Sequence, residues 1–276
     1  MKTSVIITTY NKPDYLKLSI MSLVAQSIPP TEIVIADDGS KDETRILIKE
    51  LQNKYKKIIS IRHVWHEDNG YRRAVILNKA VRECSGEYLI FTDQDCLAHK
   101  HFVRAHMEYS HVSAILGGKR VELGREFTEN VLKKSVVISS LTPSLILDSI
   151  RHRSRKVEEG IPVVNPYLRK VFHRDRITDD GIWGCNCSLY KSLFMEVNGY
   201  DEDFKYAVED NDLGIRILNK GGKIRSVRAL AIIFHLWHQK IWSPIDIRYN
   251  DDRMILMRRL ENREKVCKNG IHAINY

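Results

Sequence analysis

The order of apolar and helical segments in the first third of the chain limits the fold more strongly than any single motif. Short apolar runs that read as strands cover residues 4–8, 33–36, 58–64 and 88–91. Helical patterns separate these runs and begin at Pro13, at Asp42, which we expect to cap its helix, and at Ala74. Strands that alternate with helices predict an α/β fold with a mainly parallel sheet and helices on both faces.

Polar residues directly follow three of these strands. Residues 9–11 (TYN) follow the first strand, Asp37 and Asp38 end the second, and residues 93–95 (DQD) follow the fourth. Ligands of such folds bind beyond the carboxyl ends of the strands, so we expect these groups to line one rim. A GxGxxG fingerprint does not follow the first strand and no GxxxxGK[ST] loop occurs, so neither a dinucleotide enzyme nor a P-loop kinase is indicated.

The stretch FTDQDC at residues 91–96 places two carboxylates at the mouth of a buried strand. Mg²⁺ and Mn²⁺ bind carboxylate oxygens and bridge them to phosphates, so Asp93 and Asp95 are candidate metal ligands beside a diphosphate. A polar turn without a metal is the alternative, because the D-x-D pattern is common. Gln94 alternates away from its neighbours, so we expect it to point into the fold or toward the neighbouring helix and not at the metal.

The second half of the chain supplies further predicted elements. They are strands at residues 185–189 and 229–234, a short helix at 191–197, a helix that begins near Val208, and a basic surface helix over 247–268. Each of these segments continues the mixed α/β pattern of the first half.

Acidic and basic residues begin two of the helices. Asp210, Leu213 and Ile217 share one helix face by their spacing, so Asp210 is expected to point inward as a candidate general base. The alternative is that Glu209 and Asp210 merely favour the helix dipole, which contributes ~0.3–1 kcal/mol for each acid. Arg72, with Arg73 beside it, begins an earlier helix, where a guanidinium could neutralise phosphate or simply be solvated.

Imidazole and thiol groups offer further ligands. His235 and His238 could join the metal site, and imidazole suits Mn²⁺ better than Mg²⁺, although such a pair is also common at a surface or in a core. Cys185 and Cys187 lack the second pair that a zinc site needs, so alternation along a strand explains them better. The five cysteines show no repeated CxxC spacing, which predicts reduced thiols in a cytoplasmic protein.

Residues 122–180 break the pattern and read as an insertion or recognition region with basic clusters at 151–156 and 169–176. The net charge of +9 predicts anionic partners. We expect the basic middle and tail to contact an anionic, membrane-associated acceptor such as a lipid-linked saccharide, with a solvated basic face as the alternative. No apolar run approaches the ~20 residues of a membrane-spanning helix, and the N-terminal run reads as a strand and not as a signal peptide. Peripheral attachment at the inner face of the membrane is the corresponding expectation.

Several motifs in their order resemble the family 2 glycosyltransferases, which have the GT-A fold. SVIITTYNKPDYL, EIVIADDGSKDET and FTDQDC look like the three nucleotide-sugar motifs of that family. WGCNCSLYKSLFMEVNGYDEDF and VEDNDLGIRIL are similar to the C-terminal segment shared by galactosyltransferases and bacterial chondroitin-type polymerase domains. The resemblance covers most of the chain and leaves roughly residues 120–180 without a match.

The resemblance implies one GT-A domain over residues 1–276, with a single Rossmann-like, mainly parallel sheet and a helical or irregular insertion. Its implied parts are a nucleotide-sugar-binding half (1–120), the insertion (121–180), an acceptor and catalytic half (181–245) and a basic C-terminal helix (246–276). The implied donor-binding residues are Thr8, Thr9, Tyr10, Asn11, Asp37, Asp38, Arg72, Asp93, Gln94 and Trp183. The implied metal ligands are Asp95, Asp93, His238 and His235, and the implied catalytic residues are Asp210 as base and Glu209 as a contact to acceptor or sugar.

The resemblance also implies an activity. It is the inverting, Mn²⁺- or Mg²⁺-dependent transfer of a sugar from a nucleotide-sugar, with a UDP-sugar as the expected donor, to a hydroxyl of a saccharide or lipid-linked saccharide in bacterial surface polysaccharide or glycoconjugate synthesis. FKYAVED at residues 204–210 departs from the family, because galactosyltransferase relatives carry a Trp-Gly-rich loop there. The alternatives are a sugar nucleotidyltransferase and a non-catalytic carbohydrate-binding module. The basic clusters lack interleaved aromatic residues, so a nucleic-acid partner is not indicated.

Overall fold

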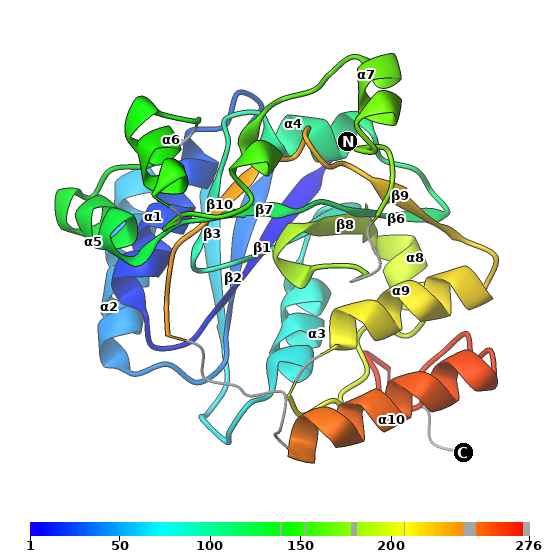
Figure 1. The fold of residues 1–276 in the computed structure, drawn as a ribbon. Coiled ribbons are helices and arrows are strands. Elements are labelled where there is room, and N and C mark those ends of the chain that lie inside the picture. Colours follow the sequence, from blue (N-terminus) through cyan, green and yellow to red (C-terminus); the bar gives the residue numbers. More distant parts are fainter. Residues whose placement is uncertain (139, 152, 178–180, 207, 240–246, 273–276) are drawn as a thin grey trace.

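A seven-stranded sheet in the order β3-β2-β1-β4-β8-β6-β9 forms the centre of the protein. The computed structural model describes all residues except 139, 152, 178–180, 207, 240–246 and 273–276 (Figure 1). The strands of this sheet are β1 (Thr3–Thr9), β2 (Glu32–Asp37), β3 (Ser60–Trp65), β4 (Tyr88–Asp93), β6 (Ala114–Gly117), β8 (Cys187–Tyr190) and β9 (Lys223–Ser226). β1, β2, β3 and β4 are parallel to one another, which confirms the predicted mainly parallel sheet.

β8 runs against both of its neighbours, β4 and β6, and so joins the second half of the chain to the parallel block. A second sheet of three strands lies beside the main one, which the sequence did not indicate. Its strands are β5 (Cys96–Ala98), β10 (Ile233–His235) and β7 (Arg120–Glu122), in the order β5-β10-β7. β10 is antiparallel to β5 and parallel to β7. This small sheet begins directly after the carboxyl end of β4.

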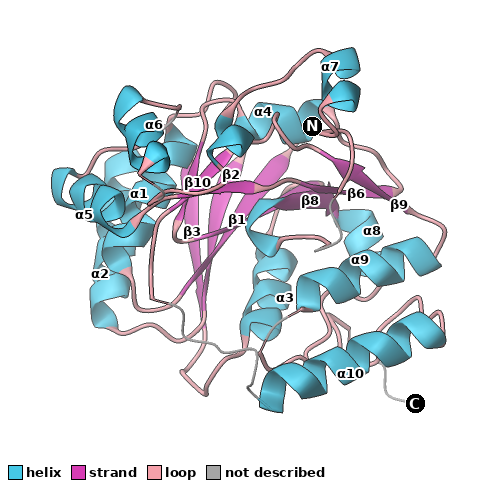
Figure 2. Cartoon of the chain, viewed as in Figure 1, coloured by secondary structure: helices cyan, strands magenta, loops and turns pink. Residues whose placement is uncertain are grey.

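The first two helices of the chain cover part of one face of the main sheet. They are α1 (Pro13–Val24) and α2 (Asp42–Tyr55), and Figure 2 shows helices on both sides of the strands. Leu16 and Ile48 pack against Ile33 in one buried cluster. Each such side chain contributes ~1.5–3 kcal/mol when it leaves water, so the apolar periodicity fixes which side of each helix faces the sheet.

Three helices cover the opposite face. They are α3 (Arg73–Glu83), α8 (Lys191–Glu196) and α9 (Glu209–Asn219). Leu77 and Leu213 are fully buried in the cluster that they form with the strands. α9 thereby holds its first turn, with the acidic pair, against the sheet.

A third apolar cluster joins the small sheet to the insertion. α5 (Arg125–Lys134) and α6 (Pro143–Ile150) pack Val131 and Leu145 against Val121 of β7. The remaining helical elements are α4 (Phe102–Glu108), η1 (Val157–Gly160), α7 (Pro166–Val171), η2 (Gly184–Asn186) and α10 (Ile247–Glu261). Within the described ranges, none of the helices combines the length and apolar character that crossing a bilayer requires.

Several local predictions need correction. Lys41 and not Asp42 occupies the N-cap of α2, and no side chain caps that helix, because Asp42 already belongs to its first turn. Ile58 donates its N–H to the Tyr55 carbonyl, so it closes the end of α2 and the following strand begins only at residue 60.

Two predicted boundaries in the second half also shift. Residues 228–230 form a turn in which Ala229 has a φ of 59°, so the strand predicted at 229–234 is confined to β10. α10 ends at Glu261 and not at 268. Directly after Glu261 the chain turns back, and the N–H of Glu264 bonds to the carbonyl of Arg259.

Candidate active site

The carboxyl ends of β1, β2 and β4 meet at one rim of the main sheet. Thr9 lies opposite Asp37 in the β1–β2 pair, and Thr8 lies opposite Asp93 in the β1–β4 pair. The Thr8 hydroxyl donates to Asp93 Oδ1 at 2.5 Å, so the two strand ends are linked through their side chains. The sequence prediction of a shared polar rim is confirmed, because parallel strands in register end at the same edge.

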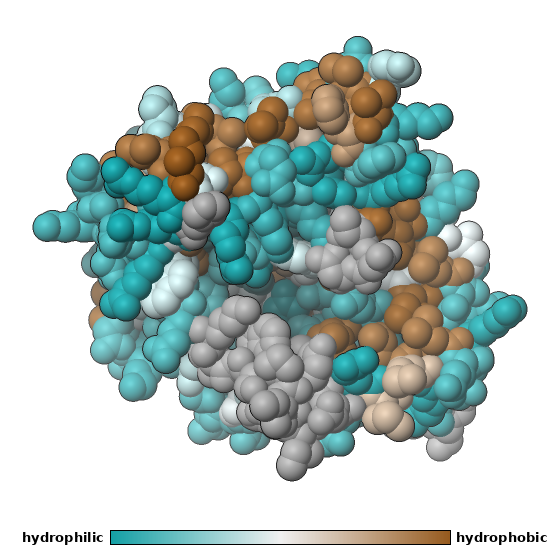
Figure 3. Space-filling view, in the orientation of Figure 1, coloured by the Kyte–Doolittle hydropathy of each residue, from teal (hydrophilic) through white to brown (hydrophobic). Residues whose placement is uncertain are grey.

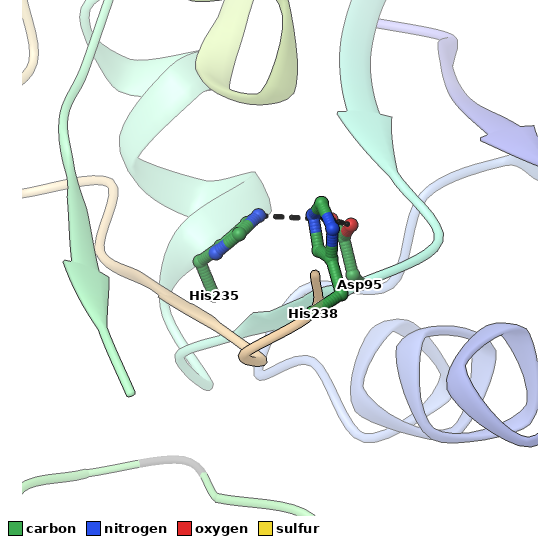
Figure 4. A group of neighbouring side chains, drawn as sticks. All are labelled: Asp95, His235 and His238. Atoms are coloured by element: carbon green, nitrogen blue, oxygen red, sulfur yellow. Dashed lines mark ion pairs between the residues drawn. The ribbon is translucent and has the colours of Figure 1, made fainter. Parts of the chain in front are cut away.

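Asp95, His235 and His238 form a compact group beside this rim. Their ligand atoms all lie within 4.8 Å of one another (Figure 4). His235 Nε2 is 3.5 Å from Asp95 Oδ1, and His238 Nε2 is 3.1 Å from Asp95 Oδ2. The small sheet creates this group, because β10 places His235 opposite Cys96 and the N–H of Leu236 donates to the Asp95 carbonyl at 2.8 Å.

The protonation of Asp95 and His235 suits a cation, whereas the hydrogen bond with Asp95 raises the pKa of His238. Burial lowers the pKa of His235 to about 4, so its imidazole is neutral at physiological pH and retains a lone pair. Burial opposes ionisation of Asp95, but the nearby His235 and His238 outweigh it and hold the pKa of Asp95 well below its ordinary value. One carboxylate and two imidazoles form a donor set that accommodates Mn²⁺ more readily than Mg²⁺. Asp93 lies outside this group of three.

A second cluster of charges centres on Arg73. Its guanidinium, 13% exposed, pairs with Glu209 at 2.5 Å, with Asp210 at 3.2 Å and with Asp93 at 3.3 Å. It therefore joins the first turn of α9 to the end of β4. The predicted Arg72 lies next to it, but its backbone N–H donates to Asp38 Oδ2 at 3.0 Å, and α3 directs the following residue toward the acids.

Asp210 occupies the inner face of α9, as its spacing with Leu213 and Ile217 predicts. Both of those residues are fully buried, and the backbone N–H of Gly184 donates to Asp210 Oδ2 at 3.0 Å. Burial raises the pKa of Asp210 to about 6, against the opposing charge of Arg73 and with a further contribution from Glu209. A carboxylate with a pKa near neutrality can accept a proton and release it again.

Asp37 and Asp38 differ in what they can contact. Asp37 is fully buried, its Oδ1 accepts the N–H of Ser40 at 2.8 Å, and its Oδ2 bonds to His63 Nε2 at 2.8 Å. Asp38 bonds to His66 Nε2 at 2.6 Å, and burial raises the pKa of its carboxyl group. Asp37 therefore shapes the turn after β2, whereas Asp38 lies nearer to the rim.

The residues after β1 are bound together by the middle residue of the D-x-D motif. Gln94 accepts from the Thr9 hydroxyl at 2.6 Å and from the Tyr10 N–H at 3.1 Å. Its amide therefore faces away from the Asp95 group, as the alternation predicts, but it bonds to the turn after β1 and not to the neighbouring helix. Asn11 adopts a φ of 49° in this turn and accepts the N–H of Lys41 at 2.8 Å. Tyr10 remains exposed at the rim.

Trp183 lies where several cations converge. Lys119, Arg120 and Lys156 are 4.2, 4.7 and 4.6 Å from its ring. The Nε atom of Arg120 is buried and has no hydrogen-bond partner among the described residues. The ring therefore belongs to a basic aromatic group that adjoins Gly184, which holds Asp210.

Sequence reasoning missed several members of the site. They are His63, His66, Tyr71 and Arg120, whereas Arg73 was named only beside Arg72. Tyr71 donates to Glu209 Oε1 at 3.3 Å. His63 lies within β3 and His66 directly follows it, near the same rim as Asp37 and Asp38, and for His66 the strand-end rule could have indicated this position.

Comparisons with known proteins agree with this arrangement. The family model described as Glycosyl transferase family 2 matches residues 4–176, and that described as N-terminal domain of galactosyltransferase matches residues 172–239. The chondroitin synthase of Escherichia coli is 25% identical over 243 residues, which cover 84% of this chain. The same match covers 34% of that protein, so the chain spans about a third of its length.

Solved structures with the same fold include two complexes with nucleotide sugars. The mannosyltransferase PcManGT of Pyrobaculum calidifontis, in complex with GDP-Man and Mn²⁺, has a TM-score of 0.61 at 15% identity, over 93% of this chain and 64% of that one. Residues 1–349 of Staphylococcus aureus TarS, in complex with UDP-GlcNAc, have a TM-score of 0.59 at 18% identity, over 95% and 66% of the two chains. At these identities the likeness concerns the fold alone, and it confirms the predicted GT-A architecture.

Proposed function

Because this chain belongs to glycosyl transferase family 2, we propose that it transfers a sugar, with inversion, from a UDP-sugar to a hydroxyl of a saccharide or lipid-linked saccharide. The observation that carries the proposal is the position of Asp210. This carboxylate, 17% exposed, is linked through Arg73 to the end of β4, and the Asp95 group begins two residues further on. A proton acceptor and a cation site therefore lie on one rim.

The donor side of the proposal rests on the strand-end residues. We assign Thr8, Thr9, Tyr10 and Asn11 and the neighbouring Asp38 to the nucleoside, because they surround the ends of β1 and β2. Asp37 supports that turn from within, and Gln94 holds the residues after β1 in place. A UDP-sugar fits the complex of the similar TarS structure, whereas the mannosyltransferase structure holds a GDP-sugar.

The metal part of the proposal rests on the donor set. Asp95, His235 and His238 would hold Mn²⁺ or Mg²⁺, with Asp93 beside them at the end of β4. Such a cation neutralises the charge that develops on a departing nucleoside diphosphate. Arg73, next to Asp93, adds a fixed positive charge on the same side.

Asp210 and its neighbours carry the proposed proton transfer. The Asp210 carboxylate removes the proton of the acceptor hydroxyl, whose oxygen then forms a bond to the anomeric carbon while the bond to the nucleoside diphosphate breaks. Attack from the face opposite the leaving group inverts the anomeric centre. Glu209, held by Arg73 and Tyr71, is assigned to the acceptor or sugar, and Trp183 to the donor side near Gly184.

A screen of UDP-sugars for metal-dependent release of UDP tests this function. We expect one or a few donors to be hydrolysed or transferred with Mn²⁺, and Asp95→Ala and Asp210→Asn to lower turnover by at least about a hundredfold. Asp14→Asn, an exposed acid on α1, is the matched control and should keep full turnover.

The same screen separates the alternatives. A sugar nucleotidyltransferase would exchange pyrophosphate with a UDP-sugar and would not need Asp210. A carbohydrate-binding module would bind without turnover in any variant. Full activity of Asp210→Asn would refute the assignment of the base.

A further inference from the structure

Two short helices of the insertion expose large apolar side chains on the same side of the molecule. Ile146, Leu147 and Ile150 of α6 are 47, 47 and 68% exposed. Tyr167 and Val171 of α7 and the following Phe172 are 73, 51 and 59% exposed. We refer to these six residues as the α6–α7 patch. Figure 3 shows apolar surface along the upper edge, over the positions that Figure 1 gives to α6 and α7.

The orientation of α7 is the reverse of that of an ordinary surface helix. Its buried residue is a cation, because Arg169 is only 6% exposed and donates to the Ser226 carbonyl at 2.7 Å. Its apolar residues Val171 and Phe172 face outward instead. Singly scattered exposed apolar residues are common, but apolar residues that gather on two helices of one side, one of them anchored by the buried Arg169, indicate a surface that has a partner.

The chain around the patch is strongly basic. Residues 151–176 contain eight Lys and Arg residues and three acidic ones, so they carry +5 of the net charge of +9. Ion pairs remove only part of this excess: Arg153 pairs with Glu126, but two other carboxylates serve two cations each. Glu122 pairs with Arg155 and Lys156, and Glu159 pairs with Arg174 and Arg228.

We propose that the α6–α7 patch docks this protein on an anionic lipid bilayer. Apolar and aromatic side chains enter the boundary between headgroups and acyl chains, and the surrounding cations bind the lipid phosphates. A protein partner would need a shaped apolar surface, whereas the patch consists of two separate helices on one side of the fold, which a flat bilayer contacts together.

The insertion that carries the patch also contacts the candidate active site. Lys156, from the same insertion, lies 4.6 Å from the Trp183 ring, and Trp183 adjoins Gly184, which binds Asp210. The insertion thus connects the patch to the candidate active site. The importance of this connection for catalysis rests on the proposed function. The docking itself does not, because lipid binding can be measured without any sugar donor.

Cosedimentation with vesicles tests the docking. The protein is mixed at low salt with vesicles of phosphatidylcholine and phosphatidylglycerol, and with vesicles of phosphatidylcholine alone. We expect binding to the anionic vesicles only, with a loss of at least tenfold in Val171→Glu/Phe172→Glu. Lys170→Glu should weaken binding by roughly fivefold or more, since each cation near an anionic surface contributes about that factor.

Met257→Glu is the matched control. Met257 is 51% exposed on α10, so it repeats the apolar-to-acid change on another exposed helix. We expect it to bind vesicles like the unchanged protein, and all variants should keep the circular dichroism spectrum and release UDP at the unchanged rate in solution. Equal binding of Val171→Glu/Phe172→Glu and the unchanged protein would overturn the proposal, as would binding that only Met257→Glu abolishes. The proposal would also be overturned if the unchanged protein did not bind anionic vesicles and sedimentation showed that the patch mediates a dimer instead.

Discussion

Replacing Asp210 by asparagine should abolish activity and yet stabilise the fold at neutral pH. The folded-state pKa of Asp210 is raised from 3.8 to about 6, mainly by burial. A carboxyl group with a raised folded-state pKa weakens the folded state wherever it must ionise. The loss begins near the unfolded-state pKa and is complete above the folded-state pKa.

The magnitude follows from the two pKa values. A shift of about two units corresponds to roughly 3 kcal/mol of unfolding free energy, and about 2 kcal/mol of it develops between about pH 4.5 and pH 8. Asp210→Asn cannot ionise, so its advantage over the unchanged protein should grow by about that amount across this range. The Arg73 pairs with Glu209 and Asp93 remain in both proteins.

Urea denaturation of both proteins at three pH values measures this difference, and turnover is recorded at the same pH values. For the unchanged protein we expect turnover to rise with pH through about 6, as Asp210 becomes able to accept a proton. Asp14→Asn serves as the control for the general effect of removing one carboxylate. A stability difference that does not change with pH, or an Asp210→Asn protein that still turns over, would refute the reasoning.

Three further changes test the surroundings of the site. His235→Ala should remove the stabilisation that Mn²⁺ with UDP gives in a thermal shift assay, and an unchanged shift would exclude His235 as a ligand. Gly184→Ala should lower turnover by at least about tenfold with little loss of circular dichroism, because the new Cβ would lie 2.2 Å from Asp210 Oδ2. Arg259→Met should lower the unfolding free energy by about 3–5 kcal/mol in urea titrations, because it leaves the buried Asp212 with fewer partners, and a change below about 1 kcal/mol would contradict this.

The local pattern of the chain was sufficient for the parts that depend on neighbouring residues. Apolar runs and helical spacing predicted the parallel block, because they decide which side of each element leaves water. The strand-end rule then placed Asp38 and Asp93 at one rim. The spacing of Asp210 with Leu213 placed its side chain on the inner face of α9.

Tertiary structure decided what depends on pairing between distant segments. The small sheet sets His235 beside Asp95 through the register of β10 with β5, and three-residue strands leave almost no periodic signal. Arg73 and not Arg72 pairs with the acids because of the rotation of the first turn of α3, which the composition of the chain does not reveal. The pKa of Asp210 likewise arises from burial by parts of the chain that meet only in the folded protein, so the sequence supplied the carboxylate and the fold supplied its basicity.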